Sequence, residues 1–267
     1  MQTIIPAVSK EVLRSELNEQ HFVRPANFGN RSIYITDARR SPNVVREIGR
    51  LREISFRQSG GGTGLELDLD EYDEGEHPFQ QLVVWCNDEE EIVGGYRFQL
   101  GSILALNTDG SYNSPTAHLF QYNAPFVEKY LPFCVELGRS FVVPTKQSGM
   151  GARGSVYTLD NLWDGLGAVT QLYPDLRYFF GKITMYPSFQ PQARDLILYF
   201  LSLHCPDKEG LMQPHEPIVL TTPMEELREA FTGSDFKSDY QTLSRRVREL
   251  GEHVPPLFSA YMKLSPT

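Results

Sequence analysis

The sequence predicts an α/β (α+β) protein in which a mixed β-sheet is flanked by helices. Residues 81–86 and 91–101 are apolar, β-rich runs separated by a short polar segment, which is the signal of a hairpin. Residues 133–186 then run in the order strand, glycine-rich turn, helix and strand, an order that predicts a crossover within one sheet. Apolar helices after residue 190 predict a helical C-terminal insertion.

The composition is that of a globular protein and argues against several classes of function. Apolar residues make up 40% of the 267 residues and charged residues 22%, so a sizeable core can form. The net charge of -9 argues against nucleic acid as the main partner. The 3 cysteines are widely spaced with no CxxC pair, and the N-terminus lacks the pattern of a signal peptide. We therefore expect a cytoplasmic location; contact with a membrane surface stays open.

A helix is expected over residues 43–57, after a mixed N-terminal arm (residues 1–43) that carries a short strand over 32–36. Apolar residues recur in it every three or four positions, which is helical spacing. Arg52 and Phe56 lie one turn apart on this helix. The spacing alone favours a solvated arginine.

An acidic loop follows the glycines of residues 60–62. It contains Asp68, Asp70 and Asp73, but Tyr72 stands where a calcium loop would have a ligand, and the loop glycine of such a site is absent. Two interpretations are left for this segment: a solvated acidic loop, or a site for a cationic amine.

Glycines and a charge interrupt the second strand of the hairpin. Gly94 and Gly95 indicate a bulge or a close approach by another backbone or by a ligand. Arg97 is a charge on a strand that otherwise looks central, so we expect it to have a partner.

The strand expected over residues 133–143 carries Glu136 and Arg139. In a regular strand, residues three apart point to opposite faces. A bulge at Gly138 would bring the two side chains to the same side. The strand therefore predicts either a bulge or two separate roles.

A glycine-rich turn follows this strand and leads into a helix over residues 154–172. Such a turn exposes backbone N–H groups to a phosphate, and the helix start adds a favourable dipole. Lys146 or Arg153 could add positive charge. A further strand is expected over residues 178–186.

Helices dominate the rest of the chain. They are expected over residues 191–204 and 235–250, and a capping box formed by Thr222 and Glu225 predicts another between them. We therefore expect one domain over residues 1–267, with a helical insertion over 190–251.

Four motifs together resemble a known pattern. They are Arg52-x-x-x-Phe56, Asp68-x-Asp70-x-x-Asp73, Gly94-Gly95-Tyr96-Arg97 and Glu136-x-x-Arg139-Ser140. In order and spacing they resemble the motifs of acyl-homoserine-lactone synthases and ornithine-lipid N-acyltransferases, two branches of the GNAT acyltransferase superfamily. The strings ELGRSFV, LDNLWDGLGA and YFFGKITMYPSF are most similar to bacterial amino-acid N-acyltransferases that make N-acyl-glycine lipids, some of them labelled hemolysins.

The resemblance covers about residues 44–267 and implies a GNAT-like, mostly antiparallel central sheet. These families continue beyond the segment that matches PPLFSAYMKLSPT, so we expect this chain to be shortened at its C-terminus. The general GNAT turn begins with Gln or Arg, whereas the segment Lys146-Gln147-Ser148-Gly149-Met150-Gly151 begins with Lys.

The resemblance implies transfer of a long-chain fatty acyl group from acyl carrier protein, or from CoA, to the α-amine of an amino acid. Glycine is the expected acceptor, and an N-acyl amino acid or lyso-aminolipid the expected product. Acyl carrier protein and the amino acid are the implied partners, with no bound cofactor and no metal. The resemblance is compatible with a cytoplasmic enzyme that contacts the inner membrane peripherally.

Three groups of residues carry the implied chemistry. The catalytic candidates are Glu136, as general base, and Arg139. The acyl-phosphopantetheine side is assigned to Ser140, Lys146, Gln147, Gly149, Gly151 and Arg153. The amine side, or alternatively an ion-pair network, is assigned to Arg52, Phe56, Asp68, Asp70, Asp73 and Arg97.

Alternatives remain for single residues and for the function of the whole protein. Glu136 could instead form a structural ion pair with Arg139 or Arg97, and Cys134 could carry an acyl-cysteine intermediate, although a buried strand cysteine more often serves packing. For the whole protein, the alternatives are a synthase of acyl-homoserine-lactone type, which would consume S-adenosylmethionine, and a non-catalytic acyl-binding or membrane-associated protein.

Overall fold

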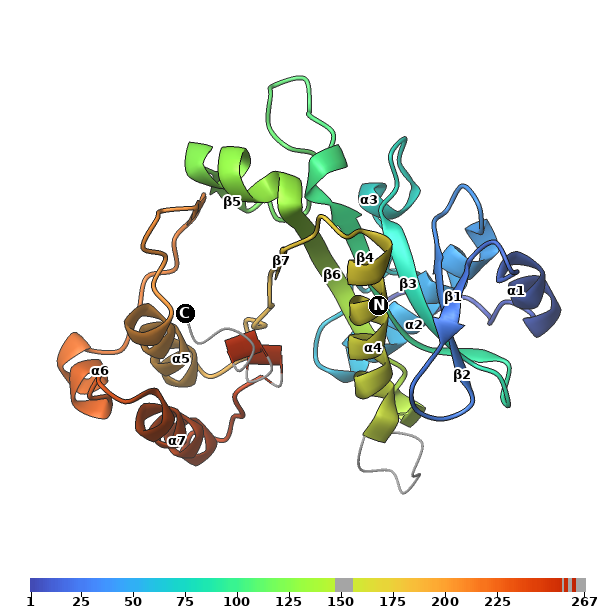
Figure 1. The fold of residues 1–267 in the computed structure, drawn as a ribbon. Helices are drawn as coiled ribbons and strands as arrows, with labels where there is room; N and C mark the ends of the chain where they lie inside the picture. Colours follow the sequence, from blue (N-terminus) through green and yellow to red (C-terminus); the bar gives the residue numbers. More distant parts are fainter. Residues whose placement is uncertain (147–155, 256, 259–260, 263–267) are drawn as a thin grey trace. The chain divides into compact units, whose positions relative to one another are not determined.

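The computed structural model describes residues 1–146, 156–255, 257–258 and 261–262. The chain divides into two compact units (Figure 1). Unit 1 comprises Met1–His118 and Val127–Lys182, and unit 2 comprises Leu119–Phe126 and Ile183–Thr267. The expectation of one domain over residues 1–267 stays a prediction.

Unit 1 is built on a six-stranded sheet in the order β1-β2-β3-β4-β6-β7. Neighbouring strands are antiparallel except for β6 and β7, which are parallel. This arrangement confirms the predicted mixed, mostly antiparallel sheet. The strands are β1 (Phe22–Pro25), β2 (Arg31–Thr36), β3 (Gln80–Cys86), β4 (Glu91–Leu100), β6 (Cys134–Val142) and β7 (Tyr178–Gly181).

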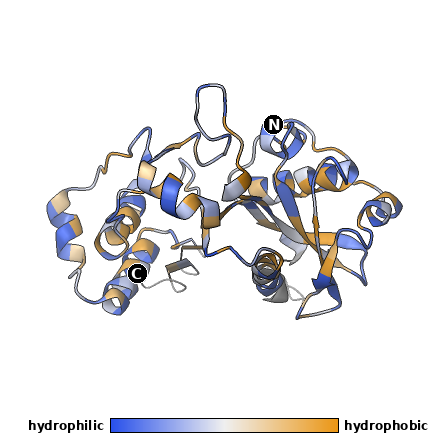
Figure 2. Cartoon of the chain, turned by 45° about the horizontal axis from the view of Figure 1, so that its top comes forward, coloured by the Kyte–Doolittle hydropathy of each residue, from blue (hydrophilic) through white to orange (hydrophobic). Residues whose placement is uncertain are grey.

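Helices pack on both faces of this sheet (Figure 1). Leu82 and Val84 of β3 pack in one apolar cluster with α4 (Val156–Leu172). Val83 and Trp85, on the opposite face, pack in a second cluster with α1 (Lys10–Glu16) and α2 (Pro42–Gln58). Alternate side chains of one strand thus serve two cores, as the pleat of a strand requires. Figure 2 shows hydrophobic residues concentrated along these strands.

The predicted hairpin and the close approach at its second strand are both confirmed. The pairing of β3 with β4 runs from Gln80↔Phe98 to Cys86↔Glu91. A Cβ atom on Gly95 would lie 2.7 Å from the carbonyl oxygen of Leu82. A larger residue at this position would therefore push the two strands apart.

Helices surround a small apolar core in the described part of unit 2. They are α5 (Pro191–His204), α6 (Met224–Ala230) and α7 (Phe236–Glu249), and their buried residues include Phe200, Leu227 and Leu243. The predicted C-terminal helices are thus confirmed. A two-stranded sheet, β5 (Phe120–Tyr122) with β8 (Met212–Pro214), was not predicted.

The capping box predicted at Thr222 is wrong. The residue that caps α6 is Pro223, which makes no side-chain capping bond. The backbone N–H and hydroxyl of Thr222 both donate to Asp195 of α5 instead, at 2.8 and 3.0 Å. Thr222 thus bonds to Asp195, which is distant in the sequence, and not to the nearby Glu225. Asp195 thereby fixes the chain that leads into α6.

The last strand of the sheet is shorter than predicted. Strand β7 ends at Gly181, not at residue 186, because the chain leaves unit 1 after Lys182. A Cβ atom on Gly181 would lie 2.4 Å from the carbonyl oxygen of Leu137, so a larger residue at this position would force the backbones of β7 and β6 to shift. Among the described helices, none is long and apolar enough to cross a membrane.

Candidate active site

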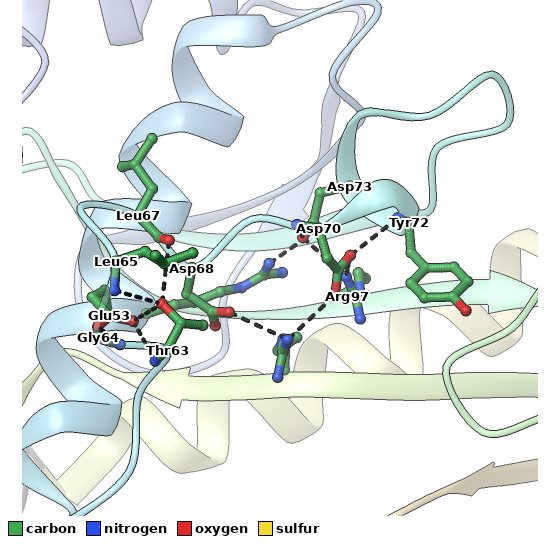
Figure 3. Close-up of polar contacts among 12 residues, drawn as sticks. Glu53, Thr63, Gly64, Leu65, Leu67, Asp68, Asp70, Tyr72, Asp73 and Arg97 are labelled. Carbon is green, nitrogen blue, oxygen red and sulfur yellow. Dashed lines mark hydrogen bonds and ion pairs between the residues drawn. The ribbon is translucent and has the colours of Figure 1, made fainter. Parts of the chain in front are cut away.

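A buried cluster of arginine and aspartate side chains lies beside the central strands of unit 1. Arg52 of α2 donates to Asp73 Oδ1 at 3.0 Å and to Gln81 Oε1 at 2.6 Å. Arg97 of β4 donates to Asp73 Oδ2 at 2.9 Å and also to Asp70 (Figure 3). The side chains of Arg52 and Asp73 are 0% exposed, so the interpretations of a solvated arginine and a solvated acidic loop are wrong at these positions. The partner expected for Arg97 is confirmed.

Charge pairing determines the ionisation of this cluster. Burial opposes the charge of Asp73, but Arg52 and Arg97 lower the pKa of this carboxyl to about 2. Burial lowers the pKa of Arg52, an effect that Asp73 counteracts. Asp73 therefore remains ionised at neutral pH and neutralises part of the charge of two arginines.

The acidic loop is held in place from both ends. Asp70 caps α3 (Glu71–Glu74) in a capping box with Asp73. Upstream, Glu53 of α2 accepts hydrogen bonds from the backbone N–H groups of Thr63 and Gly64 at 2.9 and 2.8 Å (Figure 3). Sequence reasoning missed Glu53; its place beside Arg52, on a helix, was the available signal.

Arg139 joins this loop to strand β6. Its Nη2 atom lies 3.3 Å from Asp68 Oδ1 and 3.2 Å from Asp70 Oδ2. Asp68 is 1% exposed, and burial raises the pKa of its carboxyl. Neither carboxylate oxygen of Asp68 has a hydrogen-bond partner among the described residues. Arg139 is therefore the main neighbouring charge that favours ionised Asp68.

The predicted bulge in β6 is confirmed, one residue beyond Gly138. Gly95 pairs with Phe141 and Arg97 with Gly138, so two steps along β4 match three along β6. The extra residue lies at Arg139 or Ser140, and Arg139 has φ 50°, a conformation rare outside glycine. This change of direction lets Arg139 reach the acidic loop.

Glu136 lies on β6 just before the bulge and is 2% exposed. Its Oε1 atom accepts hydrogen bonds from the backbone N–H of Thr116 at 3.0 Å and from the Thr116 hydroxyl at 2.6 Å. Its Oε2 atom is buried and has no hydrogen-bond partner among the described residues. One carboxylate oxygen is thus fixed and the other is free to meet a donor. Neither Arg97 nor Arg139 forms an ion pair with Glu136 in the described structure, unlike in the alternative interpretation.

Two residues near Glu136 were missed by sequence reasoning. Thr116 lies outside any regular element, 20 residues from its partner, and carries no motif. Lys182 directly follows β7 and donates from Nζ to the carbonyl oxygen of Pro115. The apolar strand that ends in Gly181 and a lysine was the one available signal for Lys182.

The remaining residues predicted for the site lie outside the charged cluster or outside the described part of the chain. Phe56 packs against the apolar cluster of α1, α2 and the sheet. Ser140 is half-buried in the bulge. Residues Gln147, Gly149, Gly151 and Arg153 lie outside the described residues, as does the side chain of Lys146.

Cys134 is a poor nucleophile in this environment. Its side chain is buried at the start of β6, and burial raises the pKa of its thiol to about 12. The reactive thiolate is therefore negligible at neutral pH. Among the described residues, no group of three or more metal-ligating side chains is gathered at one place.

Comparisons with known proteins identify the family of this chain. Residues 51–156 match the acetyltransferase (GNAT) domain family, a range that contains Arg52 and extends past Arg139. The chain is 51% identical over 267 residues to a glycine N(alpha)-acyltransferase of Bacteroides thetaiotaomicron, covering 100% of this chain and 79% of that protein. It is 49% identical over 267 residues to a glycine N(alpha)-acyltransferase of Phocaeicola vulgatus, covering 100% of this chain and 82% of that protein.

Proposed function

The chain belongs to the GNAT amino-acid N-acyltransferases, and we propose that it transfers a long-chain fatty acyl group to the α-amine of glycine. The names of both relatives support glycine as the acceptor. The observation that carries the proposed mechanism is the carboxylate of Glu136, with Oε1 held by Thr116 and Oε2 buried without a partner in the described structure.

Amide formation requires a base, because the α-ammonium group of an amino acid has no lone pair for attack. In our proposal, Glu136 Oε2 takes a proton from this ammonium group, directly or through a water. The neutral amine then attacks the thioester carbonyl, and the tetrahedral intermediate breaks down to an amide and a free thiol. Because Thr116 occupies Oε1, the proton has one defined destination.

The bulged part of β6 is our candidate for the thioester position. Pairing of β6 with β7 ends at Leu137↔Gly181, so residues 138–142 have no strand partner on that edge among the described residues. Backbone N–H groups on such an edge can bind the pantetheine arm or the developing oxyanion. Ser140 belongs to this segment, and we assign it to the acyl-phosphopantetheine side.

The donor is proposed to be acyl carrier protein, with CoA as the alternative, since both present the same phosphopantetheine thioester. We assign its phosphate to the glycine-rich turn and the charges of Lys146 and Arg153, which suit an acidic carrier protein. Because N-acyl-glycine is an amphiphile, we place the enzyme in the cytoplasm with peripheral contact to the inner membrane.

We propose that the charged cluster around Asp73 stabilises the site and takes no direct part in catalysis. Asp73 is saturated by Arg52, Arg97 and Gln81, which leaves it no free oxygen for a substrate amine. The less buried Asp70 links Arg97 to Arg139. We propose that this network fixes the bulge of β6, and through it the backbone beside Glu136.

Product analysis tests the proposal. Purified protein is incubated with glycine or a panel of other amino acids, together with a long-chain acyl carrier protein or the matching acyl-CoA, and the products are identified by mass spectrometry. We expect N-acyl-glycine and a faster reaction with one of the two donors. Absence of an N-acyl product with every amino acid overturns the proposal; consumption of S-adenosylmethionine with release of methylthioadenosine would instead indicate a lactone synthase.

A further inference from the structure

We infer that Lys182 binds the α-carboxylate of the amino-acid substrate, so that the enzyme selects α-amino acids over simple amines. This inference rests on the proposed function. Lys182 directly follows Gly181, which pairs with Leu137, the neighbour of Glu136 on β6.

One peptide group connects Lys182 to the proposed base. Lys182 Nζ donates to the carbonyl oxygen of Pro115, and the N–H of the same peptide group, which belongs to Thr116, donates to Glu136 Oε1. Two hydrogen bonds and one peptide group add up to at most about 8 Å between the ammonium nitrogen and this carboxylate oxygen. The ammonium group of Lys182 is thus held within about 8 Å of the carboxylate of the proposed base.

An α-amino acid fits this separation. Its nitrogen and carboxylate oxygens are about 3 Å apart, and a hydrogen bond at each end extends the reach to about 8 Å. Glycine could therefore place its amine on Glu136 and its carboxylate on Lys182. A simple amine would lack the second contact.

The three arginines of the described charged cluster already have anionic partners. Arg52 pairs with Asp73, Arg97 with Asp70 and Asp73, and Arg139 with Asp68 and Asp70. Lys182 contacts a neutral carbonyl oxygen and has no carboxylate within ion-pair distance among the described residues. Lys182 is an exposed residue, so a small anion can approach it even though its ammonium group is partly desolvated.

The charge state of Lys182 suits binding of a carboxylate. Desolvation of its ammonium group and the charges of Arg97 and Arg139 lower the pKa of Lys182 to about 8, while Glu136 acts in the opposite direction. The side chain is therefore mainly protonated at pH 7, and a bound carboxylate would stabilise that form further.

The test compares glycine with glycinamide, which keeps the amine and lacks the carboxylate. In Lys182→Met we expect kcat/KM for glycine to fall about 10- to 100-fold, mainly through KM, because a charge-assisted hydrogen bond is lost. For glycinamide we expect less than about a threefold change, since it never made that bond. Lys182→Arg should recover part of the glycine activity. Lys10→Met is the matched control, because Lys10 Nζ also donates to a backbone carbonyl, that of Glu89 at 2.7 Å, away from the site.

Several outcomes would overturn the inference. An equal loss on both amines would make Lys182 part of the reaction or of the fold, and unchanged kinetics on both would give it no role. If Lys182→Met fails to fold, the unmodified enzyme still decides: it must prefer glycine to glycinamide at least about 10-fold. An enzyme that makes no N-acyl product with any amino acid contradicts the proposed function itself, whereas N-acyl-glycine synthesis without carboxylate preference contradicts this inference alone.

Discussion

Replacement of Asp73 by Asn should destabilise unit 1 far more than loss of an ordinary ion pair. The substitution keeps the size of the side chain but leaves Arg52 and Arg97 buried without their shared counter-charge. Removing one partner of a buried ion pair costs about 3 to 5 kcal/mol. The lowered pKa of Asp73 points in the same direction: a value of about 2 in place of 3.8 corresponds to roughly 2 kcal/mol of stability at neutral pH.

Urea unfolding followed by tryptophan fluorescence measures this effect. Both tryptophans, Trp85 and Trp163, belong to unit 1, so the signal reports on the unit that contains Asp73. Glu90→Gln is the control, because it breaks an exposed ion pair with Arg14 that should contribute less than about 1 kcal/mol. An Asp73→Asn protein that loses no more stability than the control would refute the buried-network account.

The pH dependence has a defined direction. Because the folded protein lowers the pKa of Asp73, its ionisation stabilises the fold above the unfolded pKa near 4, and this contribution is lost as pH falls toward about 2. The stability difference between the unmodified protein and Asp73→Asn should therefore shrink by roughly 2 kcal/mol as the pH falls from about 5 to about 2. A difference that stays constant would contradict the lowered pKa.

Three further predictions concern single contacts. Thr116→Val should lower kcat roughly 10-fold or more because Glu136 loses a hydrogen bond to a charged group, and Thr116→Ser should restore it; unchanged kcat in the valine variant would remove Thr116 from the mechanism. Cys134→Ala should keep kcat within about threefold of the unmodified enzyme, because a thiol with a pKa of about 12 supplies no nucleophile. Loss of acyl transfer by the folded variant would instead support an acyl-cysteine intermediate. Gly95→Ala should lower the midpoint of thermal unfolding, since its Cβ would lie 2.7 Å from the backbone of β3. Gly167→Ala on α4 is the control: its Cβ would meet open space, so it should be neutral or stabilising. Equal effects of the two substitutions would contradict the close approach of β3 and β4 at Gly95.

The sequence could predict the elements whose signals are local. The hairpin of β3 and β4 follows from two β-rich runs and a polar turn, and the bulge follows from the spacing of Glu136 and Arg139 around Gly138. These predictions depend on residues within one or two strands. The structure therefore confirms them with small shifts in position.

Long-range partners could not be predicted in the same way. Helical spacing describes Arg52 equally well whether it is solvated or buried, and its partner Asp73 lies 21 residues away. Thr116 belongs to no motif, and its role depends on where an irregular segment meets β6. The early end of β7 likewise depends on the path of the chain into unit 2, which no local pattern in residues 178–186 reveals.

The central claim is that Glu136 is the base that activates the amine. The most direct measurement is the rate of N-acyl-glycine formation by Glu136→Gln at saturating donor and glycine, with circular dichroism as the check on folding. We predict that kcat falls about 10²- to 10⁴-fold while KM for the acyl donor stays unchanged, because the amide keeps the shape of the carboxylate but cannot take the proton. A folded Glu136→Gln protein with kcat within about threefold of the unmodified enzyme would contradict the claim and leave Glu136 a structural partner of Thr116.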